Sequence, residues 1–164
     1  MNKDLPMIDS GMASPANASW NVVLSYAVLR ITLGTTFLFH GVTRFVSGWG
    51  AFADQMVQGF QKTFLPELTV RPFALSVPPV ETVVGLLLIL GLFTRSTLVA
   101  GGLWMLVLVF GTTIKQDFPV VAMQLLYALL FFVLQVWEPY NRLSLDALWR
   151  KSKLAPGERP QAKS

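Results

Sequence analysis

The sequence predicts an all-α integral membrane protein: an antiparallel four-helix bundle with an amphipathic helix in the first long loop. Of its 164 residues, 53% are hydrophobic and only 13% are charged, whereas a soluble domain carries about 25% charged residues. Four segments are apolar over the roughly 20 residues that a helix needs to cross a bilayer. These segments show no strand-like alternation, and lipid cannot satisfy backbone polar groups, so we expect helices.

Three regions follow from this pattern. The N-terminus is not a signal peptide, because its small-residue triplet Ala16-Asn17-Ala18 precedes the apolar run, whereas a cleavage site follows it. We therefore expect residues 1–19 to stay attached as a flexible N-terminal tail. Residues 20–140 form the transmembrane domain, with spans at about 20–46, 73–93, 96–114 and 118–136. Residues 141–164 form a basic cytoplasmic tail suited to anionic lipid headgroups.

The first span contains most of the unusual polar residues. The stretch LGTTFLFHGVTRF includes His40, the only histidine of the chain, and Arg44 near its end. Arg30 lies three residues before it. The two arginines are fourteen residues apart, so they share a helix face, which also carries Gly34 and Gly41. Such a face is expected to turn inward, because small residues permit close packing and polar groups find partners away from lipid.

The connection from residue 47 to residue 72 is the only long one. Its apolar residues Phe52, Met56, Phe60 and Phe64 recur at helical spacing, which predicts an amphipathic helix lying on the membrane or capping the bundle. An ordinary ordered loop is the alternative.

The second span holds the only acidic residue expected within the bilayer. Glu81 lies near the expected start of this span, just after the Pro78-Pro79 pair. A carboxylate in hydrocarbon costs at least about 2.5 kcal/mol on insertion scales, so it requires a partner or a function. The tight connection 94–96 makes the second and third spans neighbours. The third and fourth spans carry no charge, although the fourth holds Gln124.

The lysines and arginines predict the orientation of the bundle. Eight of them lie on the side of the termini and the second connection, and four lie on the other side, so both termini are expected in the cytoplasm. The formal net charge of +4 then bears on topology and lipid headgroups, and we expect no nucleic-acid partner.

With this topology, four polar residues are expected to converge in the outer half of the membrane: His40, Glu81, Gln124 and Tyr127. If the second span begins well before Pro78, Glu81 lies deeper and Arg30 becomes its natural ion partner. A purely structural role is an alternative for each polar residue. Glu81 could pair with His40 or Arg30 only to fix helix register, and Arg44 could snorkel to the interface.

The chain has no cysteine and one histidine. This excludes disulfides, cysteine-ligated iron–sulfur clusters, bis-histidine haem and zinc sites built from histidine and cysteine. We therefore expect no metal-ion site. One axial ligand to a haem or chlorophyll remains available in His40, and otherwise redox chemistry would use an organic cofactor.

The segments RITLGTTFLFHGVTRF and ETVVGLLLILGLFTR resemble the DoxX family of small four-helix bacterial membrane proteins, over about residues 24–140. The most specific features are His40-Gly41, a basic residue shortly after, and a glutamate opening the second helix. The basic residue is Arg44 where the family has lysine, and Val84-Gly85 stands for a glycine pair. The family includes the DoxD-type subunit of thiosulfate:quinone oxidoreductase. The resemblance implies a multi-pass protein of the bacterial plasma (inner) membrane that works in quinone-linked redox systems with other membrane or periplasmic subunits.

The candidate site follows from what a quinone requires: hydrogen-bond donors to its carbonyls, a proton route and apolar walls. His40 and Glu81 are the candidate catalytic residues, with His40 or Tyr127 as donor and Glu81 as proton carrier. We expect Arg30, Arg44, Gln124, Tyr127 and Phe37 to contact the quinone, with Phe45 and Phe131 among the walls.

The alternative function is a non-catalytic structural subunit of a larger respiratory or photosynthetic complex, with His40 as a haem or chlorophyll ligand in one variant. A solute transporter is disfavoured, because the sequence shows no clear inverted repeat.

Overall fold

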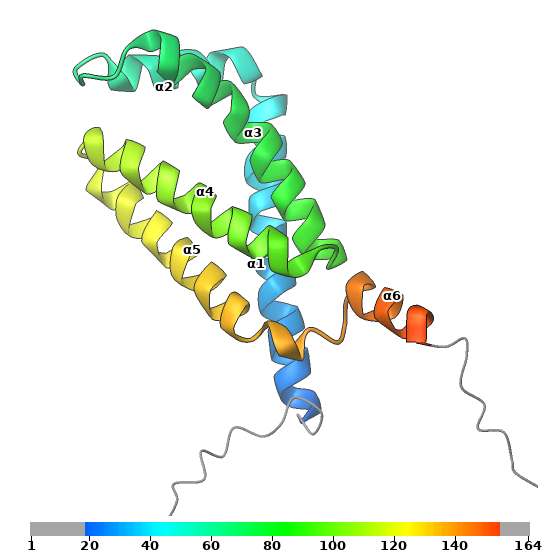
Figure 1. Cartoon of the computed structure of the whole chain (residues 1–164). Helices are drawn as coiled ribbons and strands as arrows, with labels where there is room; N and C mark the ends of the chain where they lie inside the picture. The colour runs from blue at the N-terminus through cyan, green and yellow to red at the C-terminus, as the bar shows by residue number, and fades with distance from the viewer. Residues whose placement is uncertain (1–18, 155–164) are drawn as a thin grey trace, which may run out of the picture.

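The computed structural model describes residues 19–154, and all regular structure in this part of the chain is helical (Figure 1). The remainder of the expected N-terminal tail and the end of the basic tail lie outside the described residues. Four of the helices, α1, α3, α4 and α5, are long and apolar enough to cross a membrane. The elements are α1 (Trp20–Val46), α2 (Trp49–Phe60), α3 (Glu67–Leu90), α4 (Thr94–Ile114), α5 (Phe118–Val136), the short 3-10 helix η2 (Glu138–Tyr140) and α6 (Leu145–Leu154).

The second spanning helix differs from the expected span. α3 begins at Glu67, six residues before the expected start at residue 73, and its turn to α4 is made by residues 91–93 instead of 94–96. Three prolines lie inside the helix: Pro72 and the pair Pro78 and Pro79, which we placed near the helix start. Glu81 is therefore not near the start of its helix but fourteen residues into it, about 21 Å along the axis at 1.5 Å per residue.

One of these prolines is compensated by a neighbouring helix. Pro79 has no N–H, so the carbonyl of Leu75 lacks its usual partner four residues on. The indole Nε1–H of Trp49, the first residue of α2, donates to this carbonyl at 2.9 Å. This is how membrane helices tolerate proline, because another element satisfies the freed backbone group.

The helices associate in pairs. α1 packs mainly along α3, and α4 packs mainly along α5. Figure 1 shows that the two pairs are close together near the turn between α3 and α4 and diverge toward the opposite end, which α2 crosses. We call these the α6 end and the α2 end of the molecule.

α2 lies in the long connection where the sequence predicted a helix. Its residues Ala53, Val57 and Phe60 are buried, and it packs on α3. Phe64, which the apolar spacing placed on the same helix, lies beyond its end and is 79% exposed.

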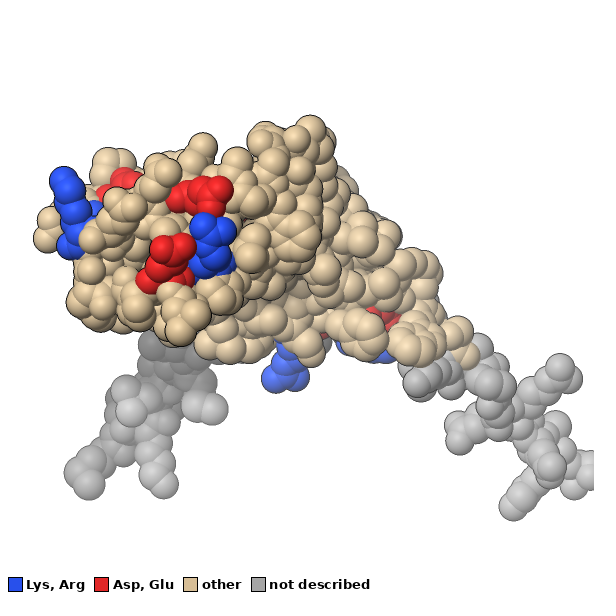
Figure 2. Space-filling view, turned by 90° about the horizontal axis from the view of Figure 1, so that it is seen from above, with Lys and Arg blue, Asp and Glu red and all other residues tan. Residues whose placement is uncertain are grey.

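Ion pairs at the surface also join α2 to the start of α3. Arg71 pairs with Asp54 of α2 at 2.7 Å and with Glu67 of α3 at 3.2 Å. Figure 2, seen from above, shows that acidic and basic side chains lie next to each other on this face.

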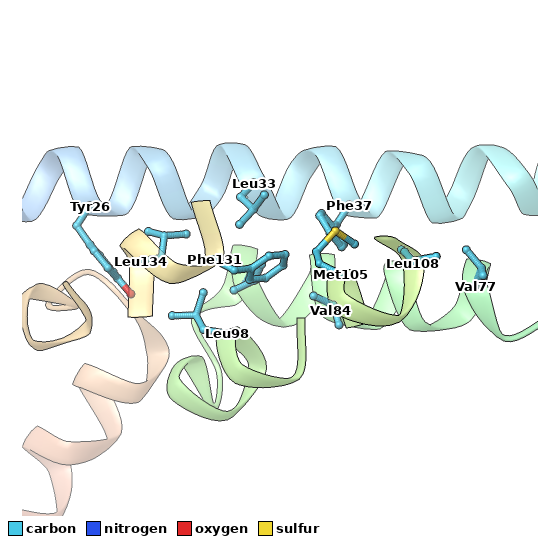
Figure 3. Packing of buried hydrophobic residues seen from close by; sticks show 11 residues of the cluster. Tyr26, Leu33, Phe37, Val77, Val84, Leu98, Met105, Leu108, Phe131 and Leu134 are labelled. Carbon is cyan, nitrogen blue, oxygen red and sulfur yellow. The ribbon is translucent and has the colours of Figure 1, made fainter. Parts of the chain in front are cut away.

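Glycines allow α1 and α3 to approach closely. A Cβ at Gly85 would meet the carbonyl of Gly34 at 2.7 Å, and a Cβ at Gly41 would meet the carbonyl of Pro78 at 2.6 Å. The apolar core continues from this contact into α4 and α5 (Figure 3). Its buried members are Tyr26, Leu33, Phe37, Val77, Val84, Leu88, Leu98, Met105, Leu108, Phe131 and Leu134.

The packed structure continues past residue 140, where we placed the boundary of the basic tail. Asn141 and Ser144 are buried, and the Asn141 amide donates to the Thr94 hydroxyl at 2.9 Å. The carboxylate of Asp146 accepts from the backbone N–H groups of Phe93 at 2.9 Å and Thr94 at 2.7 Å. Asp146 thus caps the N-terminus of α4 from a distant part of the chain.

Gly85→Ala should destabilise the fold by about 1–3 kcal/mol, because the added methyl overpacks the contact between α1 and α3. Thermal unfolding in mild detergent, followed by loss of the monodisperse peak, measures this effect. Gly102→Ala is the matched control in α4, where an added Cβ would lie 3.9 Å from Phe131. Equal stability of the two variants would contradict the close approach.

Asp146→Ala should cost about 1–2 kcal/mol, the usual loss for a helix cap. Asp117→Ala is the matched control, because Asp117 precedes α5 without a side-chain capping bond. Burial by itself would raise the pKa of Asp146, but the N–H groups of Thr94 and Phe93 outweigh it, and the pKa lies below its ordinary 3.8. The cap should therefore stabilise wild type above about pH 4 and be lost as pH falls through the lower folded pKa. A wild-type stability advantage over Asp146→Ala that did not shrink in acid would contradict this.

Candidate functional site

A cavity of about 220 Å³ lies between the two helix pairs. We call it the central cavity. All four long helices contribute to its lining. The lining residues are Phe37, His40, Arg44, Glu81, Met105, Leu108, Val120, Met123, Gln124 and Tyr127. Of the nine residues that the sequence singled out, six are in this set, and Arg30, Phe45 and Phe131 are not.

The partner of Glu81 is Arg44. The Arg44 guanidinium donates to the Glu81 carboxylate, and it also stands over the ring of Phe52 from α2, 4.9 Å from the ring centre. The Glu81 side chain is only 6% exposed and that of Arg44 is 30% exposed. The two pairings that the sequence left open, with His40 or with Arg30, are both wrong. Gly41 of α1 packs against Pro78 and Thr82 of α3, and this contact sets Glu81 beside the last turns of α1.

Arg30 has a separate role at the α6 end. It is 1% exposed, and its guanidinium donates to the carbonyls of Leu88, of Ile89 at 3.4 Å and of Leu143 at 2.8 Å. The first two carbonyls belong to the last turn of α3, whose acceptors lack partners within the helix. Arg30 therefore caps α3 and holds the segment before α6, which explains a buried charge without any ligand.

Aromatic rings form one wall of the central cavity. Tyr127 meets Phe37 edge to face at 5.8 Å and His40 at 6.2 Å between ring centres. Phe37 in turn meets Phe131 at 5.2 Å. Phe45, which we expected in this wall, does not line the cavity and packs against Trp49.

Gln124 completes the polar side of the cavity. The Thr112 hydroxyl of α4 lies 2.6 Å from Gln124 Oε1, which fixes the amide between α4 and α5. The cavity therefore combines a carboxylate, a guanidinium, an imidazole, a phenol and a primary amide with aromatic and aliphatic surface.

The cavity is exposed at the edge between α1 and α5. The lining residues with high exposure are His40 of α1 and two residues of α5, Val120 at 40% and Met123 at 56%. α1 and α5 are both candidate membrane spans, so this exposed edge lies along the membrane-spanning part of the molecule.

The sequence model of the DoxX family matches residues 25–116, more than half of the 164 residues. The chain belongs to the DoxX family. No curated protein and no solved structure matches it. Together with the four apolar helices, membership identifies a multi-pass membrane protein.

The family match covers only part of the site. It ends before α5, short of residue 140, to which the resemblance extended. Five candidate residues lie within it, and Gln124 and Tyr127 lie outside. In this member of the DoxX family, the α5 wall of the central cavity is therefore defined by the structure alone.

Sequence reasoning missed the Arg44–Glu81 pair and the early start of α3, and a signal was available only for the helix start. Pro66 followed by Glu67 is a typical helix start, with proline at the boundary and an acidic residue in the first turn. A helix counted from Glu67 gives the correct depth of Glu81 in α3, but by itself it would have favoured Arg30 as the partner. The apolar lining residues of α4 and α5, such as Met105 and Met123, carry no comparable signal.

Arg44→Gln should destabilise the protein by about 3–5 kcal/mol, because it leaves the buried Glu81 carboxylate without its partner. Glu81→Gln should cost less, since the more exposed Arg44 keeps its contact with Phe52. The double variant should be more stable than Arg44→Gln alone. A double-mutant cycle on detergent unfolding measures the coupling.

The control is a second cycle that combines Arg30→Gln with Glu81→Gln. The effects of these two substitutions on the free energy of unfolding should add. Additivity of the Arg44 and Glu81 variants would show that the pair carries no coupling.

Proposed function

We propose that this DoxX family protein binds a quinone in the central cavity and serves as the membrane component of an oxidoreductase system. The observation that carries the proposal is the combination of polar groups and aromatic walls in one cavity that opens between α1 and α5. Quinones reside in the bilayer, so an opening on the lipid side gives them direct access. Ligand sites of this kind are mostly apolar with a few convergent polar groups.

The cavity has room for the ring of a quinone but not for its tail. About 220 Å³ is below the roughly 300–1,000 Å³ of sites that enclose drug-sized ligands. A quinone ring would occupy the cavity, and its isoprenoid tail would leave between α1 and α5 into lipid.

The polar groups provide the chemistry that the ring requires. His40, Tyr127 and Gln124 can donate hydrogen bonds to the carbonyl oxygens, and Phe37 and Tyr127 supply apolar surface. Reduction of a quinone to a quinol takes two electrons and two protons, and Glu81 lines the same cavity as a proton carrier. We propose that the electrons come from a separately encoded partner subunit, with thiosulfate oxidation as the donor reaction that the family resemblance implies.

The proposed setting is a bacterial plasma membrane. There α1, α3, α4 and α5 cross as an antiparallel bundle, with both termini in the cytoplasm, and α2 lies as an amphipathic helix on the outer surface. The excess of lysine and arginine on the side of the termini supports this orientation.

A structural subunit of a larger complex is the second candidate function. It is favoured by the apolar side chains that α4 and α5 leave exposed, including Leu103, Leu106, Phe110, Leu125, Leu129 and Phe132. These side chains would meet either lipid or a partner. In the variant with a haem or chlorophyll on His40, purified protein would show the absorption bands of that pigment.

Quinone binding is tested by titrating the protein in nanodiscs with a short-tailed quinone and following tryptophan fluorescence. We expect wild type to bind, and Tyr127→Phe and Glu81→Gln each to weaken binding about tenfold, equivalent to about 1.4 kcal/mol. Phe132→Leu, at an exposed site on α5, is the control and should bind as wild type. Equal affinity of all four proteins, or absence of binding to wild type, would reject the proposed function.

A further inference from the structure

A second cavity adjoins the central one at the α2 end. It has a volume of about 210 Å³ and lies where α1 passes into α2, and we call it the α1–α2 cavity. Its lining is rich in polar groups: Thr43, Arg44, Ser47, Gly48, Ala51, Phe52 and Gln55. Arg44 lines both cavities. Its guanidinium contacts Glu81 on one side and the ring of Phe52 on the other.

The central cavity is closed by apolar side chains in the opposite direction. Phe37 forms its wall toward the α6 end. Figure 3 shows Leu33 of α1 and Phe131 of α5 beside each other, one step further from the cavity in that direction. All three are 2% exposed. The polar groups of the α6 end, among them Arg30, lie beyond this layer. Protons do not pass through packed hydrocarbon without polar groups or water, so this layer is a barrier to them.

We propose that Glu81 exchanges protons with water at the α2 end, through the α1–α2 cavity, with Arg44 as a movable gate. In the forward step a hydronium ion in the α1–α2 cavity gives its proton to the Glu81 carboxylate. An O–H bond forms on Glu81, one O–H bond of the hydronium ion breaks, and water remains. Arg44 loses its partner and turns toward Phe52 and the α1–α2 cavity. The purpose of the exchange, supplying protons to a quinone, rests on the proposed function, but the route itself does not.

Few titratable groups face the Glu81 carboxylate. They are Arg44 and His40 from α1 and Tyr127 from α5. α4 contributes the apolar Met105 and Leu108, and the nearest residues of α2 in the adjoining cavity are uncharged. A change of pH at the α2 end therefore acts on Glu81 through the ion pair with Arg44 and through the imidazole of His40.

The route is tested in liposomes that hold the full chain in one orientation and carry a pH gradient. A membrane-permeant carbodiimide labels carboxyl groups in their protonated form, and peptide mass spectrometry quantifies labelling at Glu81. We expect the labelling rate to rise about tenfold per unit of pH lowered at the α2 end, and not to change with pH at the α6 end. Labelling that follows the pH at the α6 end, or both sides equally, would overturn the proposal.

The chain has no cysteine, so a single introduced cysteine can be labelled specifically. An impermeant maleimide reports orientation through Gly50→Cys, at an exposed site of α2 with no other group within 4 Å of the added Cβ. Glu81→Gln should abolish the label on its own peptide.

Ala51→Phe, which fills the α1–α2 cavity, should slow the response of labelling to a pH jump, and Gly50→Phe should not. Equal responses of these two variants would overturn the route. The labelling experiment needs no quinone, so the two proposals can fail separately. If the protein does not bind quinone but labelling at Glu81 follows the pH at the α2 end, the proton route holds and only the proposed function is rejected.

Discussion

The ion pair between Arg44 and Glu81 is the interaction on which the site depends. A carboxylate that is only 6% exposed cannot stay charged in an apolar bundle without a close cation. The pair requires that α1 and α3 lie almost in contact, and Gly41 provides this next to the turn of α3 that carries Glu81. A side chain at Gly41 would collide with the backbone of α3 at Pro78. Close packing, the ion pair and the cavity beside it are therefore parts of one arrangement.

The two ends of the molecule use arginine in different ways. At the α6 end, Arg30 is buried and its two terminal guanidinium nitrogens donate to backbone carbonyls, while Asp146 and Asn141 close the turn between α3 and α4. These bonds of Arg30, Asp146 and Asn141 each join separate elements, so they hold this end together. At the α2 end, Arg44 is partly exposed and lies between two cavities, where its partner and surroundings can change. The same residue type on the same helix face thus stabilises the fold at one end and lines a site at the other.

The divergence of the two helix pairs explains why the cavity forms where it does. Near the α6 end, the pairs are held together by Phe131, Leu134 and Leu98 from α4 and α5. Toward the α2 end the pairs separate, and α2 covers α3 without closing the edge between α1 and α5. A site that is polar inside and open to lipid suits a ligand that is itself half polar and half apolar. This fit connects the architecture to the proposed quinone chemistry.

The sequence by itself determined the membrane class, the four apolar helices, the helix in the long connection and most of the polar residues in the cavity, with Arg30 wrongly included. These depend on composition and local periodicity, which each segment carries alone. The partners of Arg30, Arg44 and Glu81 were decided only by the tertiary structure. Positions fourteen residues apart share a helix face, so the pattern brought both arginines to α3 but could not choose between them. The choice depends on the offset of α3 along α1, and the close contacts of Gly34 with Gly85 and of Gly41 with Pro78 set that offset. The capping of α4 by Asp146 was equally beyond local sequence, because cap and helix start are more than fifty residues apart along the chain and become neighbours only on folding.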